Sequence, residues 1–285
     1  MRAILVTGAS TGIGRATTEH LCGRGHHVYA TVRRQHDAEE LTAELGEQVT
    51  PLLCDVTDQD AVLAAAESVA SSLGSQRFAG IVNNAGVAMG GPIEYLPLAK
   101  WRTQLEVNVI GQVGVTQAFL PLIREHQGRV VFIGSIGGRV ANGMLGPYAA
   151  SKFALEAIAE ALRLELAEWK IDVALVEPGA IKTAIWAKAR NYSEELTKEL
   201  GEDIGPHALE RYATLIGLVS RGIEMQDKNG IDPSRVAEAI EHALFSAKPK
   251  HRYLVGRDAM VMGAVSRIMP DKARFRLQQF VADKI

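Results

Sequence analysis

The first half of the chain alternates short apolar runs with longer stretches in which apolar residues recur every three or four positions. Short continuous apolar runs are typical of strands buried on both faces, and the longer spacing is typical of helices that cover a sheet. The short runs predict strands at Ala3–Val6, His27–Val32, Val49–Cys54, Ala79–Asn83, Val130–Ile133, Ile171–Val176 and His251–Val255.

Helical spacing fills the intervals between these strands. The predicted helices are Ile13–Arg24, Asp37–Leu45, Asp58–Leu73, Ala99–His126, Pro147–Trp169 and Asp232–Ser246. Gly111 and Gly114 weaken the pattern in the middle of the longest one, because glycine disfavours a helix interior. Strands that alternate with such helices favour right-handed crossovers, so the pattern predicts an α/β fold with a doubly wound parallel sheet in three layers.

No linker or internal repeat interrupts this alternation, which predicts a single domain over residues 1–285. The stretch from Ala180 to Gly230 departs from it and contains Gly201, Gly205-Pro206 and Asn229-Gly230. A long stretch outside the alternating pattern is usually functional, so we expect a substrate lid at about residues 180–230.

Composition narrows the class of protein. The chain has 285 residues, of which 47% are hydrophobic and 22% charged, and this excludes a wholly disordered chain. A formal net charge of −2 gives no electrostatic reason to bind nucleic acid. No apolar run approaches about 20 residues, so we expect no integral membrane segment. Cys22 and Cys54 cannot build a disulfide framework, which favours reduced thiols and a cytoplasmic location.

A glycine-rich turn separates the first predicted strand from the first predicted helix. Its sequence, Thr7-Gly8-Ala9-Ser10-Thr11-Gly12-Ile13-Gly14, spaces the glycines as Gly-x3-Gly-x-Gly. Glycines let the backbone approach a pyrophosphate, which then meets the open N–H groups of the helix N-terminus. Ligands of such sheets bind beyond the carboxyl ends of the strands, which favours this interpretation over a tight turn without a ligand.

The residues after the second predicted strand bear on the choice of nicotinamide cofactor. An acidic side chain at that point would bind an unphosphorylated ribose. The chain has Val32 there, followed by Arg33 and Arg34. A guanidinium forks onto phosphate, so the pattern favours NADP(H), with NAD(H) still possible. An exposed basic turn is the alternative interpretation.

Three further polar residues are candidates for chemistry. Tyr148 and Lys152 lie four residues apart at the start of a predicted helix, so their side chains share one face. Ser135 follows the predicted strand Val130–Ile133 at another carboxyl end. Taken alone, a Tyr and a Lys at this spacing are more often a surface pair, and a Ser after a strand is more often a turn residue.

The full set of motifs is more specific. In order, the chain contains the glycine turn, Asp55, Asn83-Asn84-Ala85-Gly86, Asn108, Ser135, Tyr148-x3-Lys152 and Pro178-Gly179. In this it resembles the short-chain dehydrogenase/reductase family, closely over residues 3–185 and loosely beyond. Its Tyr29–Arg33 segment and its length are similar to the branch with hydroxysteroid and retinol dehydrogenases. The resemblance implies a Rossmann-like, NAD(P)-binding domain.

The resemblance also implies a catalytic set. Tyr148 would be the general acid and base, and Lys152 together with the oxidised cofactor would favour its phenolate form. Lys152 would also bind the nicotinamide ribose. Ser135 would hold the substrate oxygen, and Asn108 would support a water-linked proton path from Lys152.

The cofactor-binding residues are implied in the same way. Asp55 would receive the adenine amino group, and Asn84 and Gly86 would lie beside the adenosine ribose, whereas Asn83 would brace the central strand. Ile181 and Thr183 would touch the carboxamide. The expected set is Gly8, Ser10, Thr11, Gly12, Ile13, Gly14, Arg33, Arg34, Asp55, Val56, Asn84, Ala85, Gly86, Tyr148, Lys152, Pro178, Gly179, Ile181 and Thr183.

We therefore expect an NADP(H)-dependent oxidoreductase that interconverts a ketone or aldehyde and its alcohol. Apolar residues of the expected lid, such as Leu209, Leu215 and Leu218, favour a steroid, retinoid, fatty or aromatic substrate. A β-ketoacyl-type reductase and a non-catalytic NADP(H)-sensing regulator are the alternatives. The resemblance implies a homodimer or homotetramer formed through the two longest helices.

Two weaker signals remain. The histidines His26, His27, His126, His207 and His242 lack the spacing of metal ligands, so we expect no metal site. The segment Lys248–Ile285 interleaves nine Lys or Arg and three Asp with apolar residues. We expect a helix packed on the core or at a subunit contact, and a helix on an anionic membrane surface is the alternative.

Overall fold

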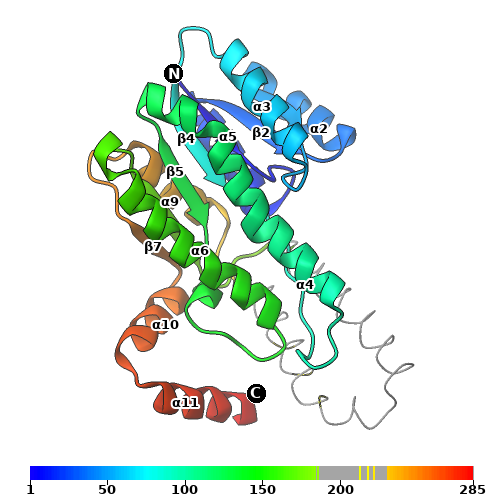
Figure 1. Ribbon diagram of the computed structural model, residues 1–285, viewed down its shortest axis with the longest axis vertical. Helices are drawn as coiled ribbons and strands as arrows, with labels where there is room; N and C mark the ends of the chain where they lie inside the picture. The colour runs from blue at the N-terminus through cyan, green and yellow to red at the C-terminus, as the bar shows by residue number, and fades with distance from the viewer. Residues whose placement is uncertain (184, 186–211, 213–216, 218–220, 222–229, 285) are drawn as a thin grey trace.

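A parallel sheet forms the centre of the computed structural model, which describes residues 1–183, 185, 212, 217, 221 and 230–284 (Figure 1). Its seven strands have the order β3-β2-β1-β4-β5-β6-β7, and every neighbouring pair is parallel. The strands are β1 (Arg2–Val6), β2 (His27–Val32), β3 (Val49–Leu53), β4 (Arg77–Asn83), β5 (Arg129–Ile133), β6 (Val173–Pro178) and β7 (Arg252–Val255).

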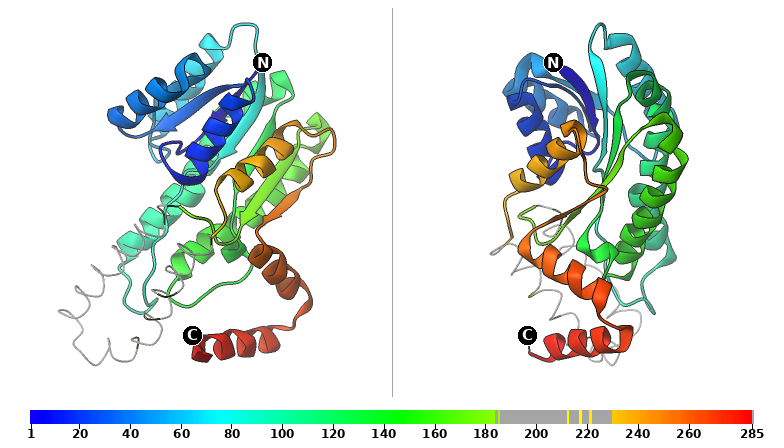
Figure 2. Two further views of the ribbon diagram at one scale, coloured as in Figure 1. Left: turned by 180° about the vertical axis from the view of Figure 1, so that it is seen from behind. Right: turned by 90° about the vertical axis from the view of Figure 1, so that its left-hand side faces the viewer.

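Helices cover both faces of this sheet, which confirms the predicted doubly wound fold (Figure 2). One face packs against α1, α2 and α9, and the other against α3, α5 and α6. Their bounds are α1 (Gly12–Gly23), α2 (Gln35–Leu45), α3 (Gln59–Ser72), α5 (Gly111–His126), α6 (Gly146–Glu165) and α9 (Ser234–Phe245). The two apolar layers bury most of the large side chains, so the hydrophobic effect fixes the sheet between them.

The strand order reverses direction between β1 and β4. From β1 the chain builds outward through β2 and β3, and it then returns to add β4 on the other side. Such a switch point leaves a crevice at the carboxyl ends of the two strands. At the end of β4, Asn83 Nδ2 donates to Thr116 Oγ1 of α5 over 2.8 Å, and so braces this central strand as expected.

The longest predicted helix is continuous but changes its winding. It consists of α4 (Leu98–Leu105), a π-helical turn (Glu106–Ile110) and α5. The two glycines do not break it. A Cβ at Gly111 would lie 2.8 Å from the carbonyl oxygen of Val56, and one at Gly114 would lie 2.6 Å from Gln59 Oε1. These glycines therefore let the helix pack closely on Val56, which follows β3, and on Gln59 at the start of α3.

The predicted lid lies mostly outside the described residues, but its two ends are described. Ile181 and Ile231 form a parallel bridge, in which Lys182 N donates to Ile231 O and Ile231 N donates to Ala180 O, each over 3.0 Å. The segment therefore leaves and rejoins the fold at adjacent points, directly after β6.

Two helices follow β7 on the side of the sheet where the strands end, α10 (Arg257–Ile268) and α11 (Asp271–Lys284) (Figure 1). α10 buries Ala259 and Gly263. In α11, by contrast, Phe275 is 59% exposed and Phe280 is 56% exposed. Of the two expected placements, packing on the core is wrong for α11, which lies beyond the sheet faces that the other helices cover (Figure 2). A subunit contact stays a prediction.

None of the described helices has the length and apolar character needed to cross a membrane. Cys22 and Cys54 are both buried free thiols.

Candidate active site

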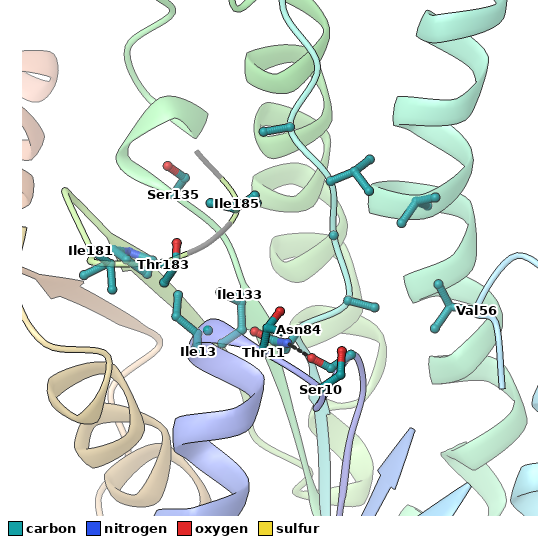
Figure 3. A pocket seen from close by; sticks show the side chains of 18 of the residues that line it. Ser10, Thr11, Ile13, Val56, Asn84, Ile133, Ser135, Ile181, Thr183 and Ile185 are labelled. Atoms are coloured by element: carbon teal, nitrogen blue, oxygen red, sulfur yellow. Dashed lines mark hydrogen bonds between the residues drawn. The ribbon is translucent and has the colours of Figure 1, made fainter. Parts of the chain in front are cut away.

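A cavity of about 350 Å³ opens at the switch point, where the carboxyl ends of the strands meet (Figure 3). It brings together residues that are far apart in the sequence. Its lining contains these sequence-predicted residues: Gly8, Ser10, Thr11, Gly12, Ile13, Arg33, Asp55, Val56, Asn84, Ala85, Gly86, Ser135, Tyr148, Lys152, Pro178, Gly179, Ile181 and Thr183.

Three sequence-predicted residues lie outside this lining. Gly14 packs beneath it, since a Cβ there would lie 2.3 Å from Gly8 O and 2.4 Å from Asn84 Nδ2. Asn108 lies behind it in the π-helical turn. Arg34 forks onto the carboxylate of Asp37, with bonds of 2.9 and 2.7 Å, and its guanidinium is therefore already bound.

The glycine turn is shaped for close approach to an anion. Gly8 and Gly12 have φ of +65° and +60°, which other residues rarely adopt. Gly8 N donates to Thr31 Oγ1 over 3.1 Å, which ties the turn to the end of β2. Thr11 precedes α1 without capping it through its side chain, so the first N–H groups of the helix suit a pyrophosphate.

The far end of the cavity carries a cation beside a carboxylate. Arg33 Nη1 lies 3.9 Å from Asp55 Oδ2, and the Arg33 side chain is 68% exposed. Asp55 Oδ1 is held by the N–H and the hydroxyl of Thr57, at 3.0 and 2.8 Å. Arg33 is thus the guanidinium that lines the cavity and remains largely open to solvent.

The candidate catalytic groups gather at the opposite end. Lys152 is 5% exposed, and its Nζ donates to the carbonyl oxygen of Ile133 over 2.8 Å. The same Nζ lies 5.8 Å from the centre of the Tyr148 ring. Ser135 Oγ accepts a 3.0 Å bond from Gly137 N, and Ser135 also hydrogen-bonds the Tyr148 side chain. Ser135, Tyr148 and Lys152 therefore form one cluster.

Burial changes the protonation of two of these groups. It lowers the pKa of Lys152 to about 8, because the buried ammonium loses its hydration. It raises the pKa of the Tyr148 phenol, and the hydrogen bond with Ser135 acts in the opposite direction. Of these two effects on the pKa of Tyr148, desolvation of the phenol is the larger.

Asn108 connects the candidate catalytic helix to the end of β4. Its Nδ2 donates to Val87 O over 3.0 Å and to Ser151 Oγ over 3.1 Å, and its Oδ1 accepts from Val87 N over 2.8 Å. Ser151 Oγ in turn donates to Tyr148 O over 2.7 Å. Sequence reasoning did not single out Ser151, although it lies on α6 between Tyr148 and Lys152.

A second cavity of about 220 Å³ adjoins the first and shares Ser135, Tyr148 and Gly179 with it. Its apolar walls include Ile136, Val140, Leu145 and Met262. Asp258 of α10 also lines it, and its Oδ2 accepts a 2.6 Å bond from Ala180 N. Sequence reasoning missed this contribution of α10, because no local motif connects it to residues 78 positions earlier.

A buried ionic network lies directly behind the site. Glu177 is fully buried, and it binds Arg139 Nε over 2.6 Å and Arg252 Nη1 over 2.7 Å. Arg252 also pairs with Glu156 of α6. Glu177 precedes Pro178, and Arg139 follows the short helix Ile136–Gly138 after Ser135. The network therefore joins the backbone segments that carry both walls of the catalytic end.

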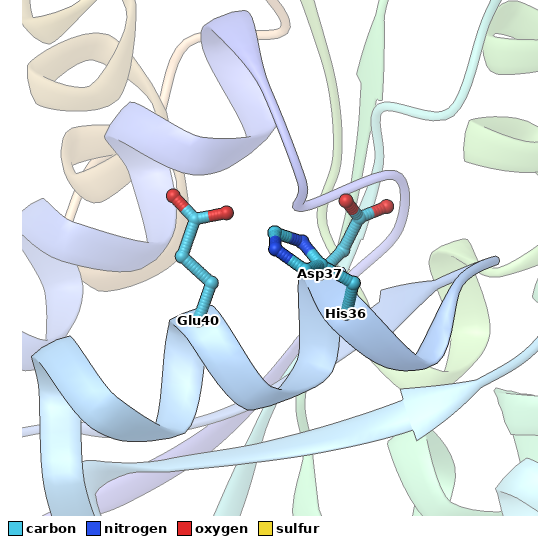
Figure 4. Close-up of side chains that lie close together, drawn as sticks. All are labelled: His36, Asp37 and Glu40. Atoms are coloured by element: carbon cyan, nitrogen blue, oxygen red, sulfur yellow. The ribbon is translucent and has the colours of Figure 1, made fainter.

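One group of possible metal ligands occurs among the described residues, on the first turns of α2 (Figure 4). The ligand atoms of His36, Asp37 and Glu40 all lie within 4.8 Å of one another. The Asp37 carboxylate already accepts the fork of Arg34, and His36 and Glu40 are exposed. We assign no metal to this group, because such exposed acidic clusters are common without one.

Comparisons with known proteins agree with this geometry. The family model described as short chain dehydrogenase matches residues 2–194. The chain is 35% identical over 277 residues to a protein of Ornithobacterium rhinotracheale named NADPH-dependent 3-dehydrocapnine reductase, covering 95% of this chain and 94% of that protein. It is 33% identical over 270 residues to human retinol dehydrogenase 16, covering 94% of this chain and 84% of that protein.

Solved structures give the same result. A short-chain dehydrogenase from Streptomyces avermitilis superposes with a TM-score of 0.76 at 29% identity, over 99% of this chain and 97% of that one. The fold, the family match over most of the chain and the length of the shared alignments point to one assignment. This chain belongs to the short-chain dehydrogenase/reductase family and is an oxidoreductase of that class, with a site for a nicotinamide cofactor.

Proposed function

We propose that this protein uses NADP(H) to interconvert a carbonyl and its alcohol on an apolar small molecule. The observation that carries the proposal is the cluster of Ser135, Tyr148 and Lys152 at one end of a cavity whose other parts are the glycine turn and Arg33. A nicotinamide cofactor bound along that cavity would supply or accept the hydride.

The side chains divide the proton chemistry among them. Tyr148 donates its phenolic proton to the substrate oxygen in reduction and takes it back in oxidation. Ser135, already bonded to Tyr148, holds the same oxygen. With its pKa at about 8, Lys152 is mostly protonated at neutral pH, and its charge stabilises the phenolate that forms when the proton leaves.

Two observations support NADP(H). The residue that would contact an unphosphorylated ribose is Val32, and the exposed guanidinium of Arg33 lies beside it in the cavity lining. The relative from Ornithobacterium rhinotracheale is named as NADPH-dependent. A 2′-phosphate is a better partner for this guanidinium than a ribose hydroxyl is.

The lining near Tyr148 supports an apolar substrate. In the first cavity Ala88, Met89 and Ile185 surround the catalytic end, and the second cavity continues between Val140 and Met262. The names of two relatives refer to retinol and to 3-dehydrocapnine. A steroid, retinoid, fatty or aromatic carbonyl suits these walls, whereas a strongly hydrated substrate would lose its solvation there.

The test is a spectrophotometric screen of NADPH consumption and NADP⁺ reduction over a panel of carbonyls and alcohols. With any substrate that turns over, Tyr148→Phe should lower kcat by about 10² to 10⁴. Tyr29→Phe is the matched control, because the Tyr29 hydroxyl bonds Ser72 of α3 and neither residue lines the cavity. Unchanged kcat in Tyr148→Phe, with the fold intact, would reject the proposal, as would a parent protein that binds NADPH and turns over no carbonyl.

We further propose a homodimer or homotetramer formed through α4, α5 and α6. Large apolar side chains are exposed along these helices and the π-helical turn between α4 and α5, and such a group is suited to a subunit contact; among them are Leu98, Leu105, Ile110 and Phe153. Sedimentation equilibrium should give two or four times the chain mass of 30.8 kDa, and a monomer mass would contradict the assignment.

A further inference from the structure

Helix α10 has two apolar sides that serve different purposes. Its inner side buries Ala259 and Gly263, and Met262 lines the second cavity. Its outer side exposes Met260 by 53%, Val261 by 61% and Ile268 by 82%. At about 100° per residue these three side chains fall on one arc of the helix, so they form one continuous exposed face.

Helix α11 exposes three further large apolar side chains, which lie on more than one side of the helix. Phe275, Leu277 and Phe280 are 59%, 37% and 56% exposed. Of the sixteen large apolar side chains exposed among the described residues, six fall between positions 260 and 280. Single exposed apolar residues are ordinary, but a concentration of this kind marks an interaction surface. We call these six residues the C-terminal apolar surface.

The same two helices carry an excess of positive charge. Between positions 257 and 284 there are six Lys or Arg and three Asp, whereas the whole chain has a net charge of −2. Two of the three aspartates have partners within the chain, because Asp258 accepts from Ala180 N and Asp271 pairs with Arg274. A partner for this surface should therefore be apolar and anionic together.

We propose that the C-terminal apolar surface docks on an anionic lipid bilayer. Large apolar side chains with Lys and Arg around them are the combination that an interfacial helix needs, since the apolar groups enter the acyl boundary and the cations meet lipid phosphates. A second copy of this chain is a poorer partner, because it would oppose one net positive surface to another. The binding is peripheral and requires no membrane-spanning segment.

The place of the surface in the fold adds a functional consequence, which rests on the proposed function. α10 lies between the second cavity and the docking surface, since Met262 faces the cavity and Met260 and Val261 face outward. Docking through α10 would therefore hold the cavity next to the bilayer, where an apolar substrate is concentrated.

The test is vesicle flotation of the full chain without cofactor or substrate, so that its outcome does not depend on catalysis. The parent should float with vesicles of phosphatidylcholine and phosphatidylglycerol, and not with phosphatidylcholine alone. Two variants separate the two contributions. Met260→Gln/Val261→Gln/Ile268→Gln should bind at least about tenfold more weakly, and Arg267→Gln/Lys272→Gln/Arg276→Gln should bind about a hundredfold more weakly.

The matched control is Leu53→Gln/Leu63→Gln, which removes exposed apolar side chains from β3 and α3. It should float like the parent. All variants should keep the parental unfolding temperature, because they change solvent-facing positions. Failure of the parent to float, equal binding to neutral vesicles, or equal weakening in the control would overturn the proposal. The proposal would also be overturned if Met260→Gln/Val261→Gln/Ile268→Gln floated like the parent but had a lower mass in solution. That result would assign the surface to contact with a second copy of the chain.

Discussion

Lys152 shows how the environment of a single residue adjusts its chemistry. Its ammonium is almost completely buried and has the carbonyl of Ile133 as a hydrogen-bond acceptor. Burial brings its pKa to about 8, from an ordinary value of 10.5. The charge that would stabilise a Tyr148 phenolate is therefore present at neutral pH and is lost at moderately alkaline pH.

The first prediction concerns pH. Because Lys152 in the folded protein loses its proton near pH 8, kcat/KM for carbonyl reduction should fall as pH rises through about 8. The measurement is a pH profile of kcat/KM, which reports the pKa values of the essential groups of the free enzyme. A profile that stays flat up to pH 10 would show that the charge of Lys152 is not required.

The second prediction concerns cofactor choice. Arg33 lines the cavity, whereas Arg34 is engaged by Asp37. Arg33→Gln should therefore weaken NADPH binding on the order of tenfold, with little change for NADH, because only NADPH has the 2′-phosphate. Arg34→Gln is the matched control and should change both affinities little. Fluorescence titration with the two cofactors measures this, and a larger loss in Arg34→Gln would reverse the assignment.

Most of the candidate site could be predicted because its residues belong to short local motifs. Ser135, Tyr148, Lys152 and the glycine turn are recognisable without knowledge of the fold. Glu177 and Asp258 were not recognisable as members of the site. Their partners Arg252 and Ala180 are 75 and 78 positions away, and only the sheet topology brings them together.

At the scale of elements, β4 joins the two halves of the sheet through an irregular stretch. Ala3 of β1 pairs with Phe78, but the next residue, Ile4, pairs with Gly80, so one residue of β4 bulges. Gly80 has φ of +142°, and a Cβ there would lie 2.0 Å from the carbonyl oxygen of Arg129 in β5. The bulge therefore requires glycine for its conformation and for the approach of β5.

The third prediction follows from this contact. Gly80→Ala should lower the free energy of unfolding by about 2–4 kcal/mol, because a backbone atom of β5 must move and the conformation is strained. Gly74→Ala is the control, since Gly74 also has positive φ but has nothing within 4 Å of its added Cβ. It should cost about 1 kcal/mol. Denaturant titration of both variants measures the difference, and equal losses would contradict the role of the contact.

The alternation of apolar runs was enough to predict the strands of the parallel sheet and the helices that cover its two faces, but not α10 and α11. It was not enough to predict the bulge, because Phe78-Ala79-Gly80 has the composition of a regular buried strand. It also misjudged Gly111 and Gly114, which weaken a helix by intrinsic preference but here allow close packing on Val56 and Gln59. The partner of a glycine is a tertiary property that local spacing does not contain.

For the whole molecule, the network behind the site links α6, β6 and β7 through charge. Glu177 accepts from Arg139 and Arg252, and Glu156 shares Arg252. Burial, together with the negative charge of Glu177, raises the pKa of Glu156 to about 7. Near neutral pH the network therefore holds a proton that an exposed glutamate would have lost.

The fourth prediction is a dependence of stability on pH. Between pH 4.5 and about 7 the folded protein keeps the Glu156 proton and the unfolded chain does not. The contribution of Glu156 to the free energy of unfolding is therefore fully present below pH 4.5 and is lost as pH rises through about 7. Glu156→Gln should remove a pH dependence on the order of 1–3 kcal/mol. Glu160→Gln on the same helix is the control. Denaturant midpoints at pH 5 and 7.5 measure it, and an unaltered slope in Glu156→Gln would contradict the assignment.

The bond from Ala180 N to Asp258 ties the last part of the chain to the cavity wall, because the neighbouring Gly179 lines both cavities. A chain shortened after Val255 would still contain every strand of the sheet, and both apolar layers would be nearly complete. It would lack the carboxylate that anchors Gly179 and Ala180. Integrity of the sheet and the shape of the cavity wall are thus separable properties, and we expect a truncated protein that folds normally to bind NADP(H) more weakly than the full chain.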